Sequence, residues 1–159
     1  MKQLNLILSL ILFSFMTACS SVNNPSRIDL IELEKKNYSI ILDSIPIQLS
    51  QTYLNNDNIS KIIKDNKKRI IHIIRKNKAS TFYSIEDLKL QNKYPSDMQY
   101  ITVNGLVLDS LEISKTKFEN GSIKYIRFLT QKDYQGKEFD DLPQVKQSVG
   151  KGILIINTE

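Results

Sequence analysis

The chain has few of the residues on which most enzyme and metal sites are built. Its 159 residues include one cysteine, Cys19, one histidine, His72, and no tryptophan. A single cysteine cannot form an intrachain disulfide or a cysteine-rich zinc site. A single histidine leaves little material for Ser-His or Cys-His catalysis or for a shared metal. We therefore assign no catalytic residue, metal ligand or cofactor, and we expect stability to come from buried isoleucine and leucine.

The overall charge is mild, but basic residues are concentrated in one stretch. The chain has 22 Lys and Arg against 17 Asp and Glu, a formal net charge of +5. Between residues 61 and 78 the only acid is Asp65. This stretch could bind phosphate of a lipid headgroup or an acidic partner, with contacts from Lys64, Lys67, Lys68 and Arg69. The simpler interpretation, which we favour, is a solvated hairpin whose lysines protect an edge strand.

The N-terminus has the pattern of a secretory signal. Lys2 supplies a short basic start, and Leu4–Met16 is apolar apart from three polar residues. This run is shorter than the roughly 20 apolar residues of a membrane-spanning helix. We expect residues 1–18 to be a signal peptide and residues 19–27 to be a solvated tether.

The tetrapeptide Met16-Thr17-Ala18-Cys19 resembles a bacterial lipobox. In that family the cysteine is acylated with diacylglycerol and becomes the mature N-terminus after cleavage. The resemblance therefore implies a lipidated Cys19 that holds the protein to a membrane. Ser20, where an aspartate would favour the inner membrane, implies an outer-membrane lipoprotein of the cell envelope. We do not expect a secreted chain of this kind to bind nucleic acid.

The remainder, residues 28–159, is expected to form a single small α+β domain with a mixed sheet and one or two short helices. Residues 28–33 and 38–42 favour strands, and Pro46 restricts the next run to an edge strand or linker. Residues 59–63 and 69–75, separated by a polar turn, predict a hairpin. The first half of this hairpin and the Ile-rich strand after it resemble residues 121–126 followed by 153–157.

Three local patterns in the second half of the chain are more specific. Ser84, three residues before Asp87, predicts the start of a short helix that ends before Tyr94-Pro95. Asn104-Gly105 between apolar arms predicts a type I′ hairpin turn. Residues 123–129 predict a strand, and 153–157 predict a central strand.

The region 100–159 also resembles the plug domain of TonB-dependent outer-membrane receptors. Three segments carry the resemblance, and they occur in the family's order: residues 101–108, 122–129 and 150–158. Asn104 stands where the family usually has aspartate. The resemblance implies a plug-like sheet with one or two helices, and it does not imply transport.

The remaining polar candidates have simpler structural explanations. His72 alternates with isoleucines, as a structural histidine in a strand does. The acids Asp133, Glu138, Asp140 and Asp141 do not have the ligand spacing of an EF-hand loop, and a solvated loop explains them better. Several tyrosines could line a glycan-binding face or occupy half-buried sheet positions: Tyr83, Tyr94, Tyr100, Tyr125 and Tyr134.

We therefore expect a non-enzymatic binding or accessory module, anchored by lipid at the outer membrane. It would contact an outer-membrane protein through an exposed sheet edge or through the Asn104-Gly105 loop. One alternative is a hydrolase of envelope polymers that uses acids such as Asp133, Glu138 or Asp141. A purely structural lipoprotein is the other alternative.

Overall fold

The computed structural model describes residues 25–95, 98, 100–130, 133 and 152–158. These residues contain three α-helices and eleven strands, which confirms the α+β class. They form two compact units, where the sequence analysis expected one domain. Unit 1 contains residues 25–50 and 57–78, and unit 2 contains residues 51–56 and those from 79 onward.

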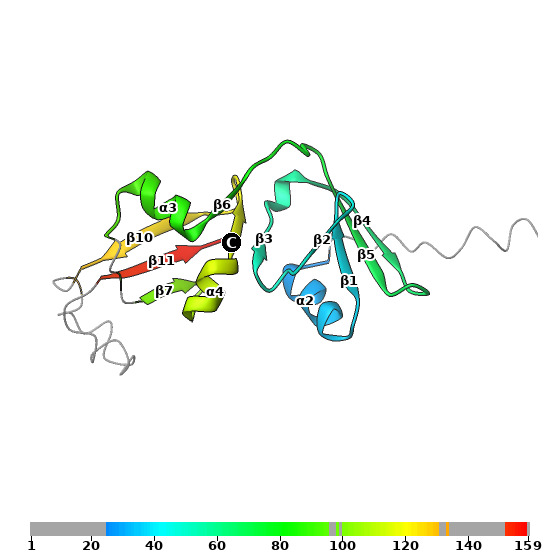
Figure 1. The fold of residues 1–159 in the computed structure, drawn as a ribbon. Coiled ribbons are helices and arrows are strands. Elements are labelled where there is room, and N and C mark those ends of the chain that lie inside the picture. The colour runs from blue at the N-terminus through cyan, green and yellow to red at the C-terminus, as the bar shows by residue number, and fades with distance from the viewer. Residues whose placement is uncertain (1–24, 96–97, 99, 131–132, 134–151, 159) are drawn as a thin grey trace, which may run out of the picture. The chain divides into compact units, whose positions relative to one another are not determined.

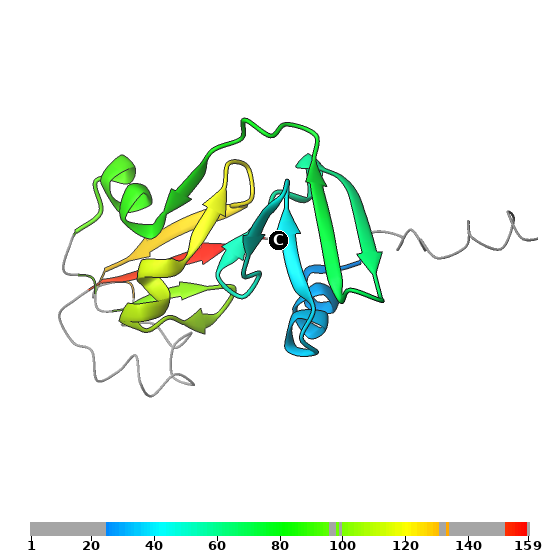
Figure 2. The same cartoon turned by 45° about the vertical axis from the view of Figure 1, so that its right-hand side comes forward.

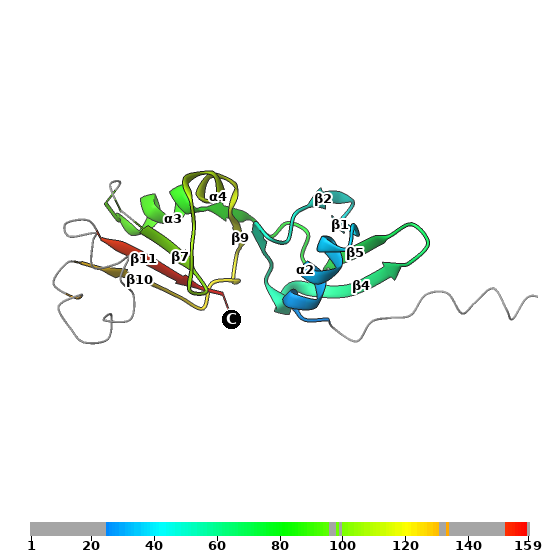
Figure 3. The same ribbon diagram turned by 90° about the horizontal axis from the view of Figure 1, so that it is seen from below.

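Unit 1 is a four-stranded mixed sheet with one helix beside it (Figure 3). Its elements are α2 (Arg27–Lys35), β1 (Ser39–Leu42), β2 (Ile45–Ile47), β4 (Ile59–Asp65) and β5 (Ile70–Arg75). The strand order is β2-β1-β5-β4, and the central strands β1 and β5 are parallel. The two outer strands are each added as antiparallel hairpins, which confirms the predicted 59–75 hairpin and the edge position of β2.

The core of unit 1 is aliphatic and lies on one face of this sheet. The side chains of a strand point alternately to the two faces of its sheet, and every second residue from Ile40 to Leu42 and from Ile71 to Ile73 is buried. The buried residues are Leu30, Ile40, Leu42, Leu49, Ile62, Ile71 and Ile73. Because these side chains lose almost all contact with water, each contributes roughly 1.5–3 kcal/mol of transfer free energy.

Unit 2 has a second four-stranded mixed sheet and a smaller three-stranded one (Figure 1). The larger sheet has the order β10-β11-β7-β8, with β11 (Ile153–Asn157) in its interior, as predicted. Its other strands are β7 (Tyr100–Val103), β8 (Leu106–Val107) and β10 (Tyr125–Leu129). The smaller sheet has the order β3-β9-β6 and consists of β3 (Thr52–Tyr53), β6 (Phe82–Ser84) and β9 (Lys117–Glu119). The helices are α3 (Ile85–Asn92) and α4 (Ser110–Lys115), and the 3-10 turn η1 (Asn56–Asn58) spans the boundary of the two units.

The core of unit 2 joins its two sheets and both helices. Ile85 and Leu88 of α3 pack with Leu154 and Ile156 of β11, and Ile113 of α4 packs against the same cluster. In Figure 3, α3 and α4 lie on the same side of β7 and β11. The rings of Tyr53 and Phe118 stack with centroids 5.1 Å apart, which ties β3 to β9.

The two units have the same arrangement of helix and strands. In each, a helix precedes a hairpin, and a later strand returns parallel to the first strand of that hairpin. Both hairpins turn on two residues with positive φ, Asp43-Ser44 at 46° and 81°, and Asn104-Gly105 at 50° and 80°. The repeat noticed in the sequence corresponds to β4 and β5 in unit 1 and to β10 and β11 in unit 2.

One expected strand is a helix. Residues 28–33 lie in α2, because Ser26 and Asp29 form a capping box that satisfies the first backbone N–H groups. The prediction considered only the β-branched and aliphatic residues of this run. The predicted α3 is confirmed, with the same kind of capping box at Ser84 and Asp87. The third helix, α4, begins at a further capping box that the sequence analysis did not recognise, Asp109 with Glu112.

None of the helices among the described residues has the length and apolar character needed to cross a membrane. The predicted signal peptide, Cys19 and the first part of the predicted tether, residues 19–24, lie outside the described residues. The end of that tether is not a solvated linker, because Ser26 is the N-cap of α2 and Arg27 is its first residue.

Candidate functional site

The four basic residues singled out from the sequence belong to one hairpin, β4–β5. Lys64 lies in β4, and Lys67, Lys68 and Arg69 form the turn that follows. The turn is shaped by Asp65, whose Oδ1 accepts hydrogen bonds from the backbone N–H groups of Lys67 and Lys68, both at 3.0 Å. Its carboxylate is therefore used by the backbone, and the three turn cations are exposed.

Two hydrogen bonds connect this turn to Tyr38 and Ser39, which follow the end of α2. The backbone N–H of Ser39 donates to the carbonyl of Arg69 at 2.9 Å, and Tyr38 Oη donates to Asn66 Oδ1 at 3.0 Å. Lys64 Nζ also lies over the Tyr38 ring, 5.1 Å from its centroid. The last residue of α2 and its C-cap, Lys35 and Lys36, are separated from Tyr38 by Asn37 alone. The structure thus adds two cations that the sequence analysis did not include. Figure 2 shows the β4–β5 turn and the C-terminal end of α2 at the same end of unit 1.

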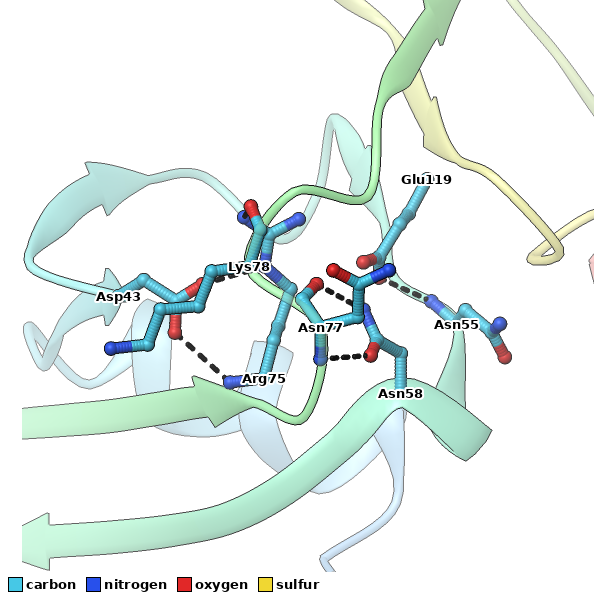
Figure 4. A network of polar contacts seen from close by, with 7 residues as sticks. All are labelled: Asp43, Asn55, Asn58, Arg75, Asn77, Lys78 and Glu119. Carbon is cyan, nitrogen blue, oxygen red and sulfur yellow. Dashed lines mark hydrogen bonds and ion pairs between the residues drawn. The ribbon is translucent and has the colours of Figure 1, made fainter.

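A buried ion pair lies at the other end of the β5 strand (Figure 4). Arg75 Nε donates to Asp43 Oδ2 at 2.6 Å, and the Arg75 backbone N–H donates to Oδ1 at 2.9 Å. Burial of Asp43 opposes ionisation, but the bonds and charge of Arg75 outweigh it, and the pKa of Asp43 is lowered. Arg75 Nη2 also donates to the Lys78 carbonyl, so the pair fastens the hairpin turn to the end of unit 1.

Asn104 occupies the equivalent position in unit 2. Its Oδ1 accepts from the Thr158 backbone N–H and its Nδ2 donates to Thr158 Oγ1, both at 2.9 Å. The amide of Asn104 therefore bonds the end of β11, as the carboxylate of Asp43 bonds the end of β5. The predicted type I′ turn is confirmed, and Asn104 has a structural role within it. Gly105 is exposed, and a Cβ at this position would meet no atom within 4 Å.

Glu119 is a buried acid that the sequence analysis did not consider. Its side chain accepts from the Asn55 backbone N–H at 2.9 Å, and the residue is 1% exposed (Figure 4). Asn55 Nδ2 donates to the neighbouring Asn120 carbonyl at 3.3 Å. These bonds hold the segment that carries β3 against the end of β9, so Glu119 positions the backbone of unit 2.

His72 lies on the face of the unit 1 sheet that does not carry the buried core. Its Cα partners across the sheet are Ile41 of β1 and Ile63 of β4, and all three residues are half-buried. This position agrees with the structural interpretation of a histidine between isoleucines. No group of three or more metal-ligating side chains occurs among the described residues.

The tyrosines divide between two environments. Tyr83 and Tyr94 pack against the core of unit 2, so they do not form an open binding face. Tyr100 and Tyr125 alternate with core residues of β7 and β10, which places them on the opposite face of the larger sheet. Asn157 Nδ2 donates to Tyr125 Oη at 2.7 Å on this face. Tyr134 lies outside the described residues.

Of the four candidate acids, only Asp133 is among the described residues. It is exposed, and its Oδ2 accepts from the Thr130 backbone N–H and hydroxyl at 2.6 and 2.7 Å. These bonds lower the pKa of Asp133, against a smaller opposing effect of burial, which favours the ionised form over a general acid. Glu138, Asp140 and Asp141 lie outside the described residues.

The sheet edges differ in how well they are protected. Among the described residues, β2 and β4 are the outer strands of unit 1, and β8 and β10 are those of the larger sheet in unit 2. β2 contains Pro46, which has no N–H to donate, and β4 has a register shift and two lysines. β8 is only two residues long. β10 has five residues, no proline and one charge, Arg127, and its register with β11 is regular.

No protein-family model matches the chain, and comparison with curated proteins and with solved structures found no match.

Proposed function

We propose that this chain is a lipid-anchored envelope protein that binds an outer-membrane partner without catalysing a reaction. The anchor is a lipid on Cys19, and the partner-binding element is the edge of β10 that faces away from β11. The observation that carries this proposal is the five-residue edge of β10, which pairs on its outer side with no other strand among the residues that the structure describes. The resemblance of residues 100–159 to a plug domain, which rests on the sequence alone, supports the same type of module.

An exposed edge strand binds a partner by continuing its sheet. Every second residue of β10 directs its N–H and C=O groups away from β11, and an extended segment can pair with them. Each such hydrogen bond contributes on the order of 1 kcal/mol net. Side chains give selectivity: Tyr125 and Arg127 are exposed, while Ile126 and Phe128 on the other face of the strand pack against the core.

The anchor is tested by membrane fractionation and intact-mass measurement of the wild type and of Cys19→Ala. We expect a mature wild-type chain that begins at Cys19, carries acyl chains and remains in the membrane fraction. The variant should lose the acyl mass and its retention in the membrane. A wild-type protein without acyl mass would refute the anchor.

The binding edge is tested by site-specific photocrosslinking in the envelope of the cells that make the protein. A crosslinker at Arg127 of β10 is compared with one at Val107 of β8, on the opposite edge of the same sheet. We expect one outer-membrane protein to be captured from position 127 and not from position 107. Equal capture from both positions, or none from position 127, would refute the assignment to β10.

A further inference from the structure

The end of unit 1 that contains the β4–β5 turn carries a dense cluster of cations from two separate segments. We call it the basic end, and it consists of Lys35, Lys36, Lys64, Lys67, Lys68 and Arg69. The Tyr38–Asn66 and Ser39–Arg69 hydrogen bonds bring the two segments together. The cluster is therefore a property of the fold, since residues 36 and 67 are far apart in sequence.

The acids near these cations are already engaged. Asp65 accepts the two backbone bonds of the turn, and Glu32 pairs with Lys35 at 3.7 Å. The carboxylate oxygens of Glu34 accept from the backbone N–H groups of Leu49 and Ser50. Five of the six cations, all except Lys35, make no ion pair with any residue that the structure describes. The basic end thus carries a clear surplus of positive charge.

The cations at the end of α2 have a structural explanation, but the same explanation does not apply to the cations of the turn. Lys35 and Lys36 lie at the C-terminus of α2, where cations offset the helix dipole. Lys67, Lys68 and Arg69 occupy a hairpin turn, and Arg69 has a φ of 53°, a conformation better suited to glycine or asparagine. A long cationic residue at this position is not favoured by the backbone.

We propose that the basic end binds the phosphate groups of an anionic phospholipid surface. Exposed cations spread over a turn and a helix end suit a charged surface that offers many phosphates at once. This proposal rests on the proposed lipid anchor, because the anchor brings unit 1 to the bilayer. Only Ser20 to Pro25 separate Cys19 from the N-cap of α2, and they span at most about 20 Å when extended. α2 is about 14 Å long at 1.5 Å per residue, which is shorter than the extended linker. The linker therefore allows the helix to lie along the bilayer, with its basic C-terminal end at the headgroups.

The experiment measures vesicle binding of the chain from Ser20 to Glu159, which lacks the lipidated residue and retains every described element. Cosedimentation with vesicles of phosphatidylglycerol and phosphatidylcholine is compared with phosphatidylcholine alone. We expect binding to the anionic vesicles only, weakened by added salt because exposed charges are screened. Binding that is abolished by a few millimolar inorganic phosphate at constant ionic strength would indicate a site for free phosphate and overturn the proposal.

The decisive variant is Lys67→Gln/Lys68→Gln/Arg69→Asn, in which asparagine suits the positive φ of position 69. The matched control removes three exposed cations of unit 2, as Lys115→Gln/Lys117→Gln/Lys124→Gln. We expect the first variant to bind anionic vesicles on the order of a hundredfold more weakly, about fivefold for each cation, and the control to bind nearly as the wild type does. Equal losses would show that net charge alone matters and would overturn the proposal.

Circular dichroism and thermal unfolding of both variants establish that each is folded. The outcome is independent of the anchor test. Acylation of Cys19 without vesicle binding would refute only the basic end, whereas vesicle binding by a chain that is never acylated would refute only the anchor.

Discussion

Two residues at equivalent turn positions bond to the backbone of the neighbouring strand with different side chains. Asp43 in unit 1 and Asn104 in unit 2 both have positive φ, and each accepts a hydrogen bond from the end of the neighbouring parallel strand. Short polar side chains tolerate this conformation and can bond to nearby backbone. Asp43 also forms an ion pair with the Arg75 guanidinium, which the neutral side chain of an asparagine could not form.

The first prediction concerns this pair. Asp43→Ala removes the carboxylate that pairs with Arg75, at a site where both side chains are at most 10% exposed. We expect a loss of about 3–5 kcal/mol in the free energy of unfolding. Asp43→Asn keeps the oxygen acceptor, as Asn104 does in unit 2, and we expect a smaller loss. Urea unfolding at pH 7 measures both. A loss as large for asparagine as for alanine would show that the charge, and not the acceptor, holds the turn.

The pH dependence follows from the lowered pKa of Asp43. A carboxyl group whose pKa is lower in the folded state stabilises the protein above its unfolded pKa, near 3.8, and this stabilisation is lost as pH falls through the folded value. We expect the stability of the wild type to fall more steeply below about pH 4 than that of Asp43→Asn. Parallel curves for the two proteins would contradict this expectation.

At Ser122 we expect a substitution to maintain or raise the stability of the protein. Its hydroxyl is buried and has no hydrogen-bond partner among the described residues, and the residue is 3% exposed. Burial of an unpaired hydroxyl costs roughly 1–3 kcal/mol. Ser122→Ala should therefore leave the free energy of unfolding unchanged or raise it by about 1 kcal/mol. Ser114→Ala, on an exposed helix position, serves as the control, and a loss at position 122 greater than at 114 would argue against an unpaired hydroxyl.

At the scale of the element, the helices depend on their first turns. All three begin at a capping box in which the N-cap side chain and the acid three residues later satisfy each other's backbone N–H groups. Helices of six to nine residues are too short to be stable alone, so caps and packing determine whether they form. The N-cap Ser26 therefore explains why residues 28–33, whose composition favours a strand, form a helix.

We expect Ser84→Ala to destabilise α3 by about 1 kcal/mol, because the N-cap hydroxyl would no longer accept from the Asp87 N–H. Hydrogen exchange of residues 85–92 should become faster, while the strands of unit 1 keep their rates. Ser84→Asp, which preserves an acceptor, is the matched control. Faster exchange in both variants would indicate that the hydroxyl is needed for a reason other than capping.

At the scale of the whole molecule, the chain contains two copies of one arrangement with different surfaces. Each copy has a helix, a hairpin with positive-φ turn residues and a returning parallel strand. The turn between the last two strands is short and basic in unit 1. We propose that unit 1 contacts the membrane surface through this turn and that unit 2 binds a protein through β10.

Because each unit has its own core, a core substitution should act mainly within its unit. Leu154→Ala removes a fully buried side chain of unit 2, and Ile73→Ala does the same in unit 1. We expect each to cost about 2–5 kcal/mol and to accelerate hydrogen exchange chiefly in its own unit. A uniform increase over both units in either variant would show that the chain unfolds as a single cooperative domain.

The sequence by itself determined the features that depend on neighbouring residues. These include the α3 capping box, the Asn104-Gly105 turn, the β4–β5 hairpin and the interior strand β11, because local backbone preferences and hydrophobic runs specify them. The signal peptide and lipobox remain expectations, since they lie outside the described residues.

Only the tertiary structure decided what depends on residues far apart in the chain. The approach of the α2 end to the 67–69 turn, the Asp43–Arg75 pair and the Glu119–Asn55 bond each join segments that no local pattern connects. The division into two units also depends on long-range pairing. Residues 51–56 belong to unit 2, although unit 1 contains the residues on both sides of them, because β3 within this segment pairs with β9. Local propensities act over a few residues, whereas packing and charge act through space, and for that reason the basic end became apparent only in the folded chain.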